Sequence, residues 1–205
     1  AATPTWTLAN HDVDREPTRY GGGPAGLARA RAMAQVMLAL PGAVFIYNGE
    51  ELGLPNVDLP DEALRDPVWE RSGHTRRGRD ASRVPEPWEG DAPPFGFSDS
   101  PDTWLPLPPE WAALTVDKQL ADADSTLSFF CHAIELRRDR TEFDGSTVEW
   151  LDSPADGLVF RLSSGLLCAL NAGRRAMALP DGELLLASGA LVDGKLPPNT
   201  AAWLV

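Results

Sequence analysis

The feature that most restricts the possible folds is a short apolar segment, a helical segment and a second apolar segment in succession near the start of the chain. The run Trp6 to Ala9 ends abruptly in polar residues, as a buried strand does where it leaves a sheet. Between Pro24 and Leu40 apolar residues recur at helical spacing, and Pro41-Gly42 ends the pattern. The run Ala43 to Tyr47 is apolar throughout, which suits a parallel strand covered on both faces. This order predicts a βαβ unit and an α/β fold class.

A long segment of different character follows the second strand. Residues 52–123, here called the excursion loop, are rich in proline, show little periodicity and contain Trp69, Trp88, Trp104 and Trp111. Loops longer than about 12 to 15 residues in compact domains are usually functional or disordered, and flexible linkers are poor in aromatic residues. We therefore expect the excursion loop to be ordered, with its tryptophans mainly packing the loop on itself; lining the entrance of a ligand site is the alternative role.

A second helix is predicted from Ser125 to about Arg138. Asp124 or Ser125 is expected to cap its start, and the arginines near its end complement the helix dipole. The apolar face is expected to bury four residues: Leu127, Phe130, Cys131 and Ile134.

After Glu142 the sequence changes to short β-like runs separated by Asp-Gly dipeptides, which are typical of hairpin turns. This pattern predicts an antiparallel, all-β domain over residues 142–205, preceded by an α/β part over residues 1–141. The predicted strands lie at residues 147–151, 157–162, 166–170, 183–186, 190–192 and 201–205.

Composition excludes several classes of function. The 30 acidic and 18 basic residues leave a formal net charge of −12, which opposes binding to nucleic acid or to an anionic membrane surface. No run approaches the roughly 18 apolar residues of a membrane span. Cys131 and Cys168 have neither metal-ligand spacing nor a disulfide framework, so both are predicted to be buried thiols of a cytoplasmic protein. We expect no cofactor and no metal. The chain starts at Ala1 without Met and enters a strand at once, so further upstream sequence is expected.

The polar residues Asn10, His11 and Asp12 follow the first predicted strand. Loops at the carboxyl ends of parallel strands hold the active sites of barrel enzymes. An isolated Asn-His-Asp triplet can equally cap a loop through hydrogen bonds to the backbone. The triplet alone therefore leaves both interpretations open.

A wider pattern resembles one family at three places. The chain has Asn10-His11-Asp12-x-x-Arg15-x-x-x-Arg19-Tyr20-Gly21, then Tyr47-x-Gly49-Glu50-Glu51-Leu52-Gly53. The third segment runs from Gly78 to Trp88 (Gly-Arg-Asp-Ala-Ser-Arg-Val-Pro-Glu-Pro-Trp). In this order the segments resemble alpha-glucosidases and oligo-1,6-glucosidases of the alpha-amylase family (glycoside hydrolase family 13), although Val84 and Glu86 replace the family's Thr and Met. Ile134 to Arg138 resembles the final barrel helix.

The resemblance implies a retaining glycosidase, in which one carboxylate attacks the anomeric carbon and a second acts as acid and then base. Asp12 matches the family's third carboxylate, which stabilises the developing positive charge. His11 and Arg79 would contact the sugar. Arg83 is a further candidate substrate-binding residue, although bracing the loop is its favoured role. Loop support and surface ion pairs are the structural alternatives for these three residues.

Two further sets of charged residues accompany the motifs. Arg15, a candidate substrate-binding residue, and Arg19 follow Asp12 closely and could keep its carboxylate ionised; a structural role is the alternative for both. Glu50 and Glu51, although a carboxylate pair, are interpreted as scaffold. The family's nucleophile and acid/base match no residue here and are expected upstream of Ala1.

The resemblance therefore implies the last part of a (β/α)8 TIM barrel, strands seven and eight, followed by a β-sandwich C-terminal domain. The parent enzyme would hydrolyse terminal alpha-linked glucose of short malto- or isomalto-oligosaccharides or small alpha-glucosides, and the missing N-terminal part of the barrel would be a partner of this chain. Alternatives are a transglycosylating relative, such as a glucosyltransferase or a sucrose or trehalose isomerase, a non-catalytic homologue acting as a binding subunit, and a carbohydrate-binding β module.

Overall fold

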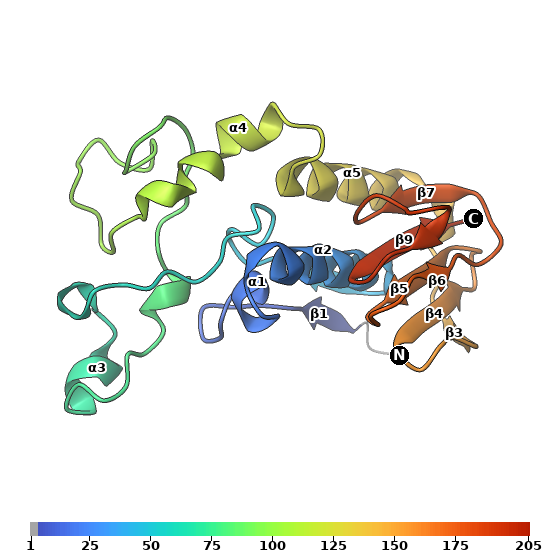
Figure 1. Ribbon diagram of the computed structural model, residues 1–205, viewed down its shortest axis with the longest axis horizontal. Coiled ribbons are helices and arrows are strands. Elements are labelled where there is room, and N and C mark those ends of the chain that lie inside the picture. The colour runs from blue at the N-terminus through green and yellow to red at the C-terminus, as the bar shows by residue number, and fades with distance from the viewer. Residues whose placement is uncertain (1–3) are drawn as a thin grey trace.

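A parallel strand pair and the helix between its strands form the first part of the molecule. The computed structural model describes residues 4–205, and in it β1 (Thr5–Thr7) pairs with β2 (Ala43–Phe45) in the register Trp6 to Val44. The connection contains the short helix α1 (Glu16–Arg19) and the long helix α2 (Gly23–Ala39) (Figure 1). The predicted βαβ unit is confirmed. Both strands are shorter than predicted because the chain after each leaves the ladder and enters a polar loop.

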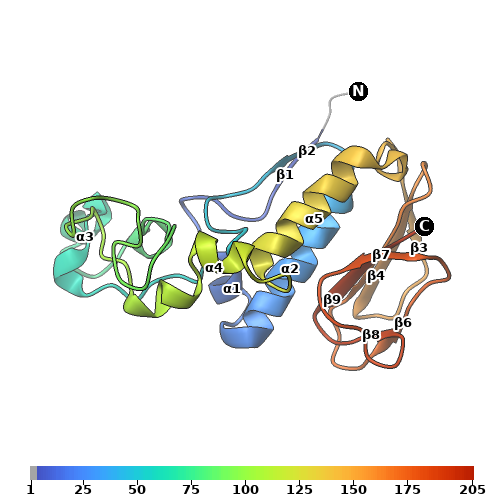
Figure 2. The same cartoon turned by 90° about the horizontal axis from the view of Figure 1, so that it is seen from above.

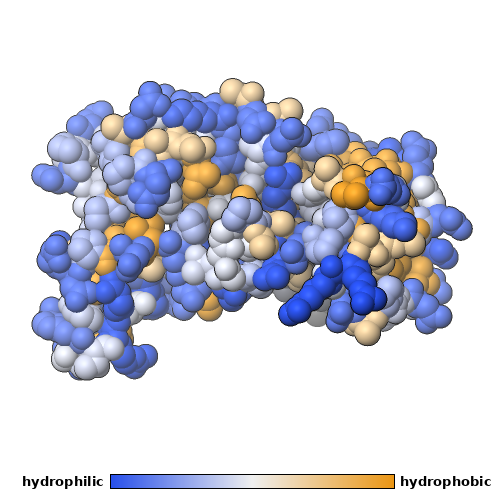
Figure 3. Space-filling view, viewed as in Figure 1, coloured by the Kyte–Doolittle hydropathy of each residue, from blue (hydrophilic) through white to orange (hydrophobic). Residues whose placement is uncertain are grey.

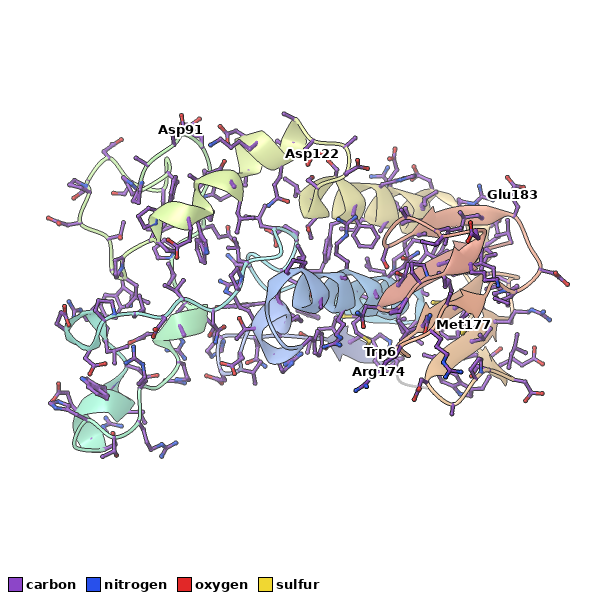
Figure 4. The ribbon with its side chains drawn as sticks, viewed as in Figure 1. Trp6, Asp91, Asp122, Arg174, Met177 and Glu183 are labelled. Carbon is purple, nitrogen blue, oxygen red and sulfur yellow. The ribbon has the colours of Figure 1, made fainter. Side chains whose placement is uncertain are left out.

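The boundaries of α2 follow from its sequence. Pro24 lies in the first turn, where its missing N–H costs no hydrogen bond, and Leu40, which is extended, ends the helix before Pro41. The Trp6 indole, labelled in Figure 4, donates to the Pro41 carbonyl over 2.8 Å and so ties β1 to the turn that leads into β2.

The excursion loop is ordered around its own apolar core, as predicted. It contains α3 (Pro67–Arg71), α4 (Val116–Leu120) and the 3-10 helices Asp61–Ala63, Asp80–Ser82 and Pro109–Ala113. Trp111 is buried in this core, whereas Trp88 and Trp104 are 48% and 66% exposed. The tryptophans therefore contribute only in part to the packing of the loop on itself. The buried members of the core are Leu52, Leu54, Leu59, Leu64, Val84, Phe95, Leu105, Leu107 and Trp111.

Helix α5 (Thr126–Asp139) begins where predicted, and its cap is Ser125, whose hydroxyl accepts from the Ser128 amide at 3.0 Å. Its buried face differs from the prediction. Phe129, Phe130 and Ala133 are buried, whereas Cys131 is exposed and Ile134 is 41% exposed. The helix packs against α2 and α4, and this contact turns the side that carries Cys131 and Ile134 outward. The prediction that both thiols are buried holds only for Cys168, where burial raises the thiol pKa.

The remainder of the chain, after the 3-10 helix Thr141–Phe143, forms two antiparallel sheets. The larger has the order β3-β4-β5-β9-β7 and the smaller consists of β6 and β8. The predicted strand at 190–192 is wrong: Val192 makes only an isolated bridge to Lys195, across a tight turn in which Asp193 and Gly194 both have positive φ. The strands are β3 (Val148–Leu151), β4 (Gly157–Leu162), β5 (Leu167–Asn171), β6 (Met177–Ala178), β7 (Leu184–Ala187), β8 (Lys195–Leu196) and β9 (Thr200–Leu204).

The larger sheet has an apolar core on each face. One face contributes Phe160 and Trp203 to a cluster shared with Val36 of α2 and Ala133 of α5. The other face packs with Met177 of β6, labelled in Figure 4, and with β8. The predicted sandwich thus has one large and one very small sheet, and the large sheet also packs on the helices. Because the first cluster contains residues from both sides of 141/142, the boundary at that point stays a prediction.

The molecule is elongated. In Figure 2 the excursion loop lies at one end and the antiparallel sheets at the other, with α2 and α5 side by side between them. The face drawn in Figure 3 is mostly hydrophilic, with apolar residues in separate patches. No helix among residues 4–205 is long and apolar enough to cross a membrane.

Candidate active site

The polar loop after β1 holds Asp12 in a fixed turn. The Asn10 side-chain oxygen accepts from the Asp12 amide at 2.8 Å, and the Asn10 carbonyl accepts from the Val13 amide at 3.4 Å. An Asn that bonds to the backbone two residues ahead forms a compact turn without help from other segments. The Asp12 side chain remains 52% exposed at the carboxyl end of β1.

Two arginines from the excursion loop converge on this carboxylate. Asp12 Oδ1 lies 2.7 Å from Arg79 Nη1 and 3.2 Å from Arg83 Nη2. The Arg79 hydrogen bond is the main cause that lowers the pKa of Asp12, followed in the same direction by the charges of His11, Arg79 and Arg83, while desolvation opposes them. The site therefore keeps Asp12 as a carboxylate. The arginines meet it across 67 and 71 residues of sequence.

His11 lies beside Asp12 and faces solvent. Its Nε2 is 3.4 Å from Asp12 Oδ1, and its side chain is 63% exposed. Its backbone carbonyl accepts from Arg83 Nε at 2.9 Å. Arg83 thus binds the backbone and the carboxylate of one loop, as the bracing interpretation predicts, while the His11 imidazole stays open to a ligand.

Arg79 is also bound by Asp66, a residue for which the sequence predicted no role. Asp66 Oδ2 lies 2.7 Å from Arg79 Nε, whereas Asp12 Oδ1 contacts a different nitrogen of the same guanidinium, Nη1. The Asp66 side chain is only 2% exposed. A signal existed in the sequence, because Asp66-Pro67 is a typical start of a helix, with Asp as the N-cap and Pro in the first turn. The pairing with Arg79 had no such signal.

Arg15 is placed differently from its prediction as a substrate-binding residue. It is 2% exposed, its Nη1 donates to the Asn48 carbonyl at 2.5 Å, and its guanidinium lies 5.2 Å from the centre of the Tyr47 ring. A side chain this buried cannot touch a sugar, and further protein could only bury it more. Arg15 instead ties the loop after β1 to the loop after β2, which corrects the prediction.

Arg19 likewise acts on the backbone. Its Nη2 donates to the Leu8 carbonyl at 2.6 Å and to the Tyr20 hydroxyl at 3.3 Å. Neither Arg15 nor Arg19 is among the groups that lower the Asp12 pKa. The suggestion that they keep Asp12 ionised is therefore replaced by the roles of Arg79 and Arg83.

Glu50 and Glu51 support the loop after β2, in agreement with their interpretation as scaffold. Glu50 Oε2 accepts from the Tyr47 amide at 3.1 Å, and Glu51 Oε2 accepts from the Gly49 amide at 2.9 Å. Burial, followed by the charge of Glu16, raises the pKa of Glu50 to about 8. Neither glutamate contacts Asp12.

An open cavity of about 580 Å³ lies beside the carboxylate. Its walls include Asp12, Asp66, Gly78 and Arg79. Within residues 4–205 no group of three or more His, Cys, Asp or Glu residues is arranged to hold a metal ion. The site thus has the Asp12 carboxylate and the Arg79 guanidinium on the cavity wall, with Arg83 and the His11 imidazole beside Asp12. A carboxylate placed in this way can accept from sugar hydroxyls and stabilise developing positive charge.

Comparison with known proteins agrees with this chemistry. Residues 1–144 match the family described as alpha amylase, catalytic domain. A probable alpha-glucosidase of Rhizobium meliloti (strain 1021) is 32% identical over 170 residues, covering 81% of this chain and 30% of the relative. The chain therefore spans less than a third of the length of this curated relative.

Solved structures give the same picture. An alpha-glucosyl transfer enzyme, XgtA, aligns with a TM-score of 0.79 and 32% identity, over 99% of this chain and 40% of that enzyme. The trehalulose synthase MutB from Pseudomonas mesoacidophila MX-45 aligns with a TM-score of 0.80 and 26% identity, over 98% of this chain and 42% of that enzyme. The agreement extends through the antiparallel sheets, because nearly the whole chain is covered.

Proposed function

This chain belongs to the alpha-amylase catalytic-domain family, and from that membership we propose that it is part of a retaining alpha-glucosidase in which Asp12 stabilises the transition state. The substrates would be terminal alpha-linked glucose units of short oligosaccharides or small alpha-glucosides. β1 and β2 would be strands seven and eight of a (β/α)8 barrel, and the nucleophile and acid/base would come from protein outside residues 1–205. The relative named alpha-glucosidase, 32% identical, supports this assignment.

The observation that carries the proposal is the ionised Asp12 carboxylate at the carboxyl end of β1, held by two arginines beside the cavity. A fixed negative charge stabilises an oxocarbenium-like transition state more than the neutral substrate, and this difference accelerates the reaction. Arg79, which lines the cavity, and His11, which is exposed beside Asp12, offer donors for sugar hydroxyls. Arg83 would act mainly through the loop that carries Asp12.

The experiment is steady-state kinetics of the complete enzyme with an aryl alpha-glucoside. Asp12→Asn keeps the side-chain shape and removes the charge, so we expect kcat/KM to fall by about 10²- to 10³-fold with the fold intact. Asp14→Asn, two residues along the same loop, is the matched control and should leave the rate near that of the native enzyme. A loss below about tenfold for Asp12→Asn would sink the assignment.

A transglycosylating enzyme is the second candidate, and the structural neighbours favour it as an alternative: one is an alpha-glucosyl transfer enzyme and another a trehalulose synthase. Hydrolysis and transfer use the same carboxylates and differ in the acceptor. Product analysis with maltose and with sucrose separates them, since free glucose as the main product supports hydrolysis and new disaccharides support transfer. Absence of any turnover would favour a non-catalytic binding subunit.

A further inference from the structure

Asp66 occupies an enclosed position at the start of α3. Its side chain is 2% exposed, and its Oδ1 accepts from the Val68 amide at 3.0 Å, which caps the helix. The backbone of Asp66 is fixed as well, because Asp80 Oδ2 accepts from the Asp66 amide at 2.7 Å and from the Arg65 amide at 2.5 Å. Asp66 is thus fixed both at its backbone amide and at one oxygen of its carboxylate.

The second oxygen of Asp66 binds one residue twice. Oδ2 accepts from the Arg79 backbone amide at 3.1 Å and from Arg79 Nε at 2.7 Å. While Nε binds Asp66, Arg79 Nη1 donates to Asp12 Oδ1 at 2.7 Å. Arg83 Nη1 lies 3.9 Å from the same Asp66 oxygen. One enclosed carboxylate therefore faces both arginines that reach Asp12.

Asp66 keeps its negative charge at any pH at which the enzyme would work. The Arg79 side-chain hydrogen bond, the Val68 amide and the Arg79 amide lower the pKa of Asp66 to about 2 against the opposing effect of burial. Without this partner, the long Arg79 side chain would be held by the exposed Asp12 alone. A free arginine side chain carries considerable rotamer entropy, so a single exposed contact holds it poorly.

We propose that Asp66 is a positioning residue, which holds the Arg79 guanidinium by Nε so that its Nη1 stays on Asp12 and its remaining donors face the sugar site. This inference rests on the proposed function. Although Asp66 lines the cavity, its oxygens are engaged by the Val68 amide and by the amide and Nε of Arg79. Its contribution passes through Arg79, and the test is built on that dependence.

The test is a double-mutant cycle in the complete enzyme, with kcat and KM measured on an aryl alpha-glucoside. Asp66→Asn keeps an oxygen for the Val68 cap but offers no second carboxylate oxygen to Arg79 Nε. We expect kcat/KM to fall by about 10- to 100-fold, the range known for groups that orient metal ligands. In the Arg79→Ala background the same change should cost less than about threefold, because the residue through which Asp66 acts is gone.

Two further variants keep the test decisive. Asp61→Asn removes an exposed carboxylate of the same loop that pairs with Arg77 instead, and it should leave kcat/KM within about twofold. If Asp66→Asn does not fold, Asp66→Ser retains a hydroxyl that can cap α3 and replaces it in the cycle. An equal loss with and without Arg79, or no loss with Arg79 present, would overturn the inference.

The outcome is separable from that of the proposed function. If Asp12→Asn has little effect, the proposed function fails whatever Asp66 does. If Asp12→Asn and Arg79→Ala are both costly while Asp66→Asn has the same effect in both backgrounds, the function stands and Asp66 is only a structural cap of α3.

Discussion

At the scale of single residues, the site depends on Asp12 Oδ1, which binds the guanidinium groups of both Arg79 and Arg83. Each of these arginines also binds a second group. Arg79 is anchored by Asp66, whereas Arg83 is anchored by the His11 carbonyl. Arg79 is therefore positioned from the excursion loop toward the cavity, and Arg83 secures the loop after β1. Substitution of Arg79 and substitution of Arg83 should therefore have different effects.

Arg79→Ala should raise the pKa of Asp12, because it removes the hydrogen bond that is the main cause lowering this pKa. Asp12 must be ionised to stabilise positive charge, so the acid limb of the kcat/KM profile should move to higher pH and the rate should fall. Arg83→Ala should move the limb less and lower the melting temperature more, through loss of the His11 contact. Kinetics from pH 3 to 7 and thermal unfolding of both variants provide the check; equal shifts and equal losses of stability would mean that both residues are structural.

At the scale of elements, the turn before Arg79 determines whether Asp66 and Arg79 can meet. Gly78 has φ +75°, and a Cβ on it would lie 2.6 Å from the Asp66 Cβ. Such a distance is far inside van der Waals contact, and the side chain it meets is itself enclosed. Only glycine combines this left-handed backbone with room for Asp66.

Gly78→Ala should lower the free energy of unfolding by more than about 2 kcal/mol, since strain of about 1 to 2 kcal/mol for a left-handed non-glycine residue adds to the clash. Gly73 is the matched control: it has φ +64°, and nothing lies within 4 Å of its added Cβ. Gly73→Ala should therefore show the backbone strain alone. Denaturant unfolding of both variants measures the difference, and equal losses would mean that the Asp66 side chain moves aside without cost.

At the scale of the whole molecule, the parallel strand pair has unpaired outer edges in the part of the chain that the structure describes. Within residues 4–205, β1 and β2 pair only with each other, and Phe45 of β2 is 63% exposed. Ile134 of α5 and Leu120 of α4 add exposed apolar surface, at 41% and 63%. Unpaired strand edges and apolar surface favour association with further chain.

Residues 1–205 purified alone should therefore form aggregates or a complex with a partner, and they should not hydrolyse 4-nitrophenyl alpha-glucoside. Asp12 can stabilise charge, but under the proposed function the nucleophile and the proton donor lie elsewhere. Light scattering and an activity assay, on the chain alone and mixed with the rest of the protein, test both points. Turnover by the chain alone would refute this view of the site, whereas activity that arises only on mixing would support it.

The sequence by itself determined the elements and the family. The pattern of apolar residues was sufficient to predict α2, α5, the parallel pair and the five strands of the larger sheet, because local patterns distinguish helices from strands. The motifs around Asp12 and Arg79 predicted the candidate site residues, because chemistry demands particular side chains at the end of a strand.

Only the tertiary structure decided which charged groups meet. Arg15 and Arg79 both stand in family-like motifs, yet Arg15 is enclosed beneath the loops and Arg79 reaches Asp12 across 67 residues. The tertiary structure alone likewise decided that Cys131 of α5 is exposed and that β6 and β8 pair in a small sheet. Contacts between distant segments depend on packing in three dimensions, and no local pattern records them. Asp66 illustrates the limit: its sequence predicts a helix cap, and only the folded chain places Arg79 against its other oxygen.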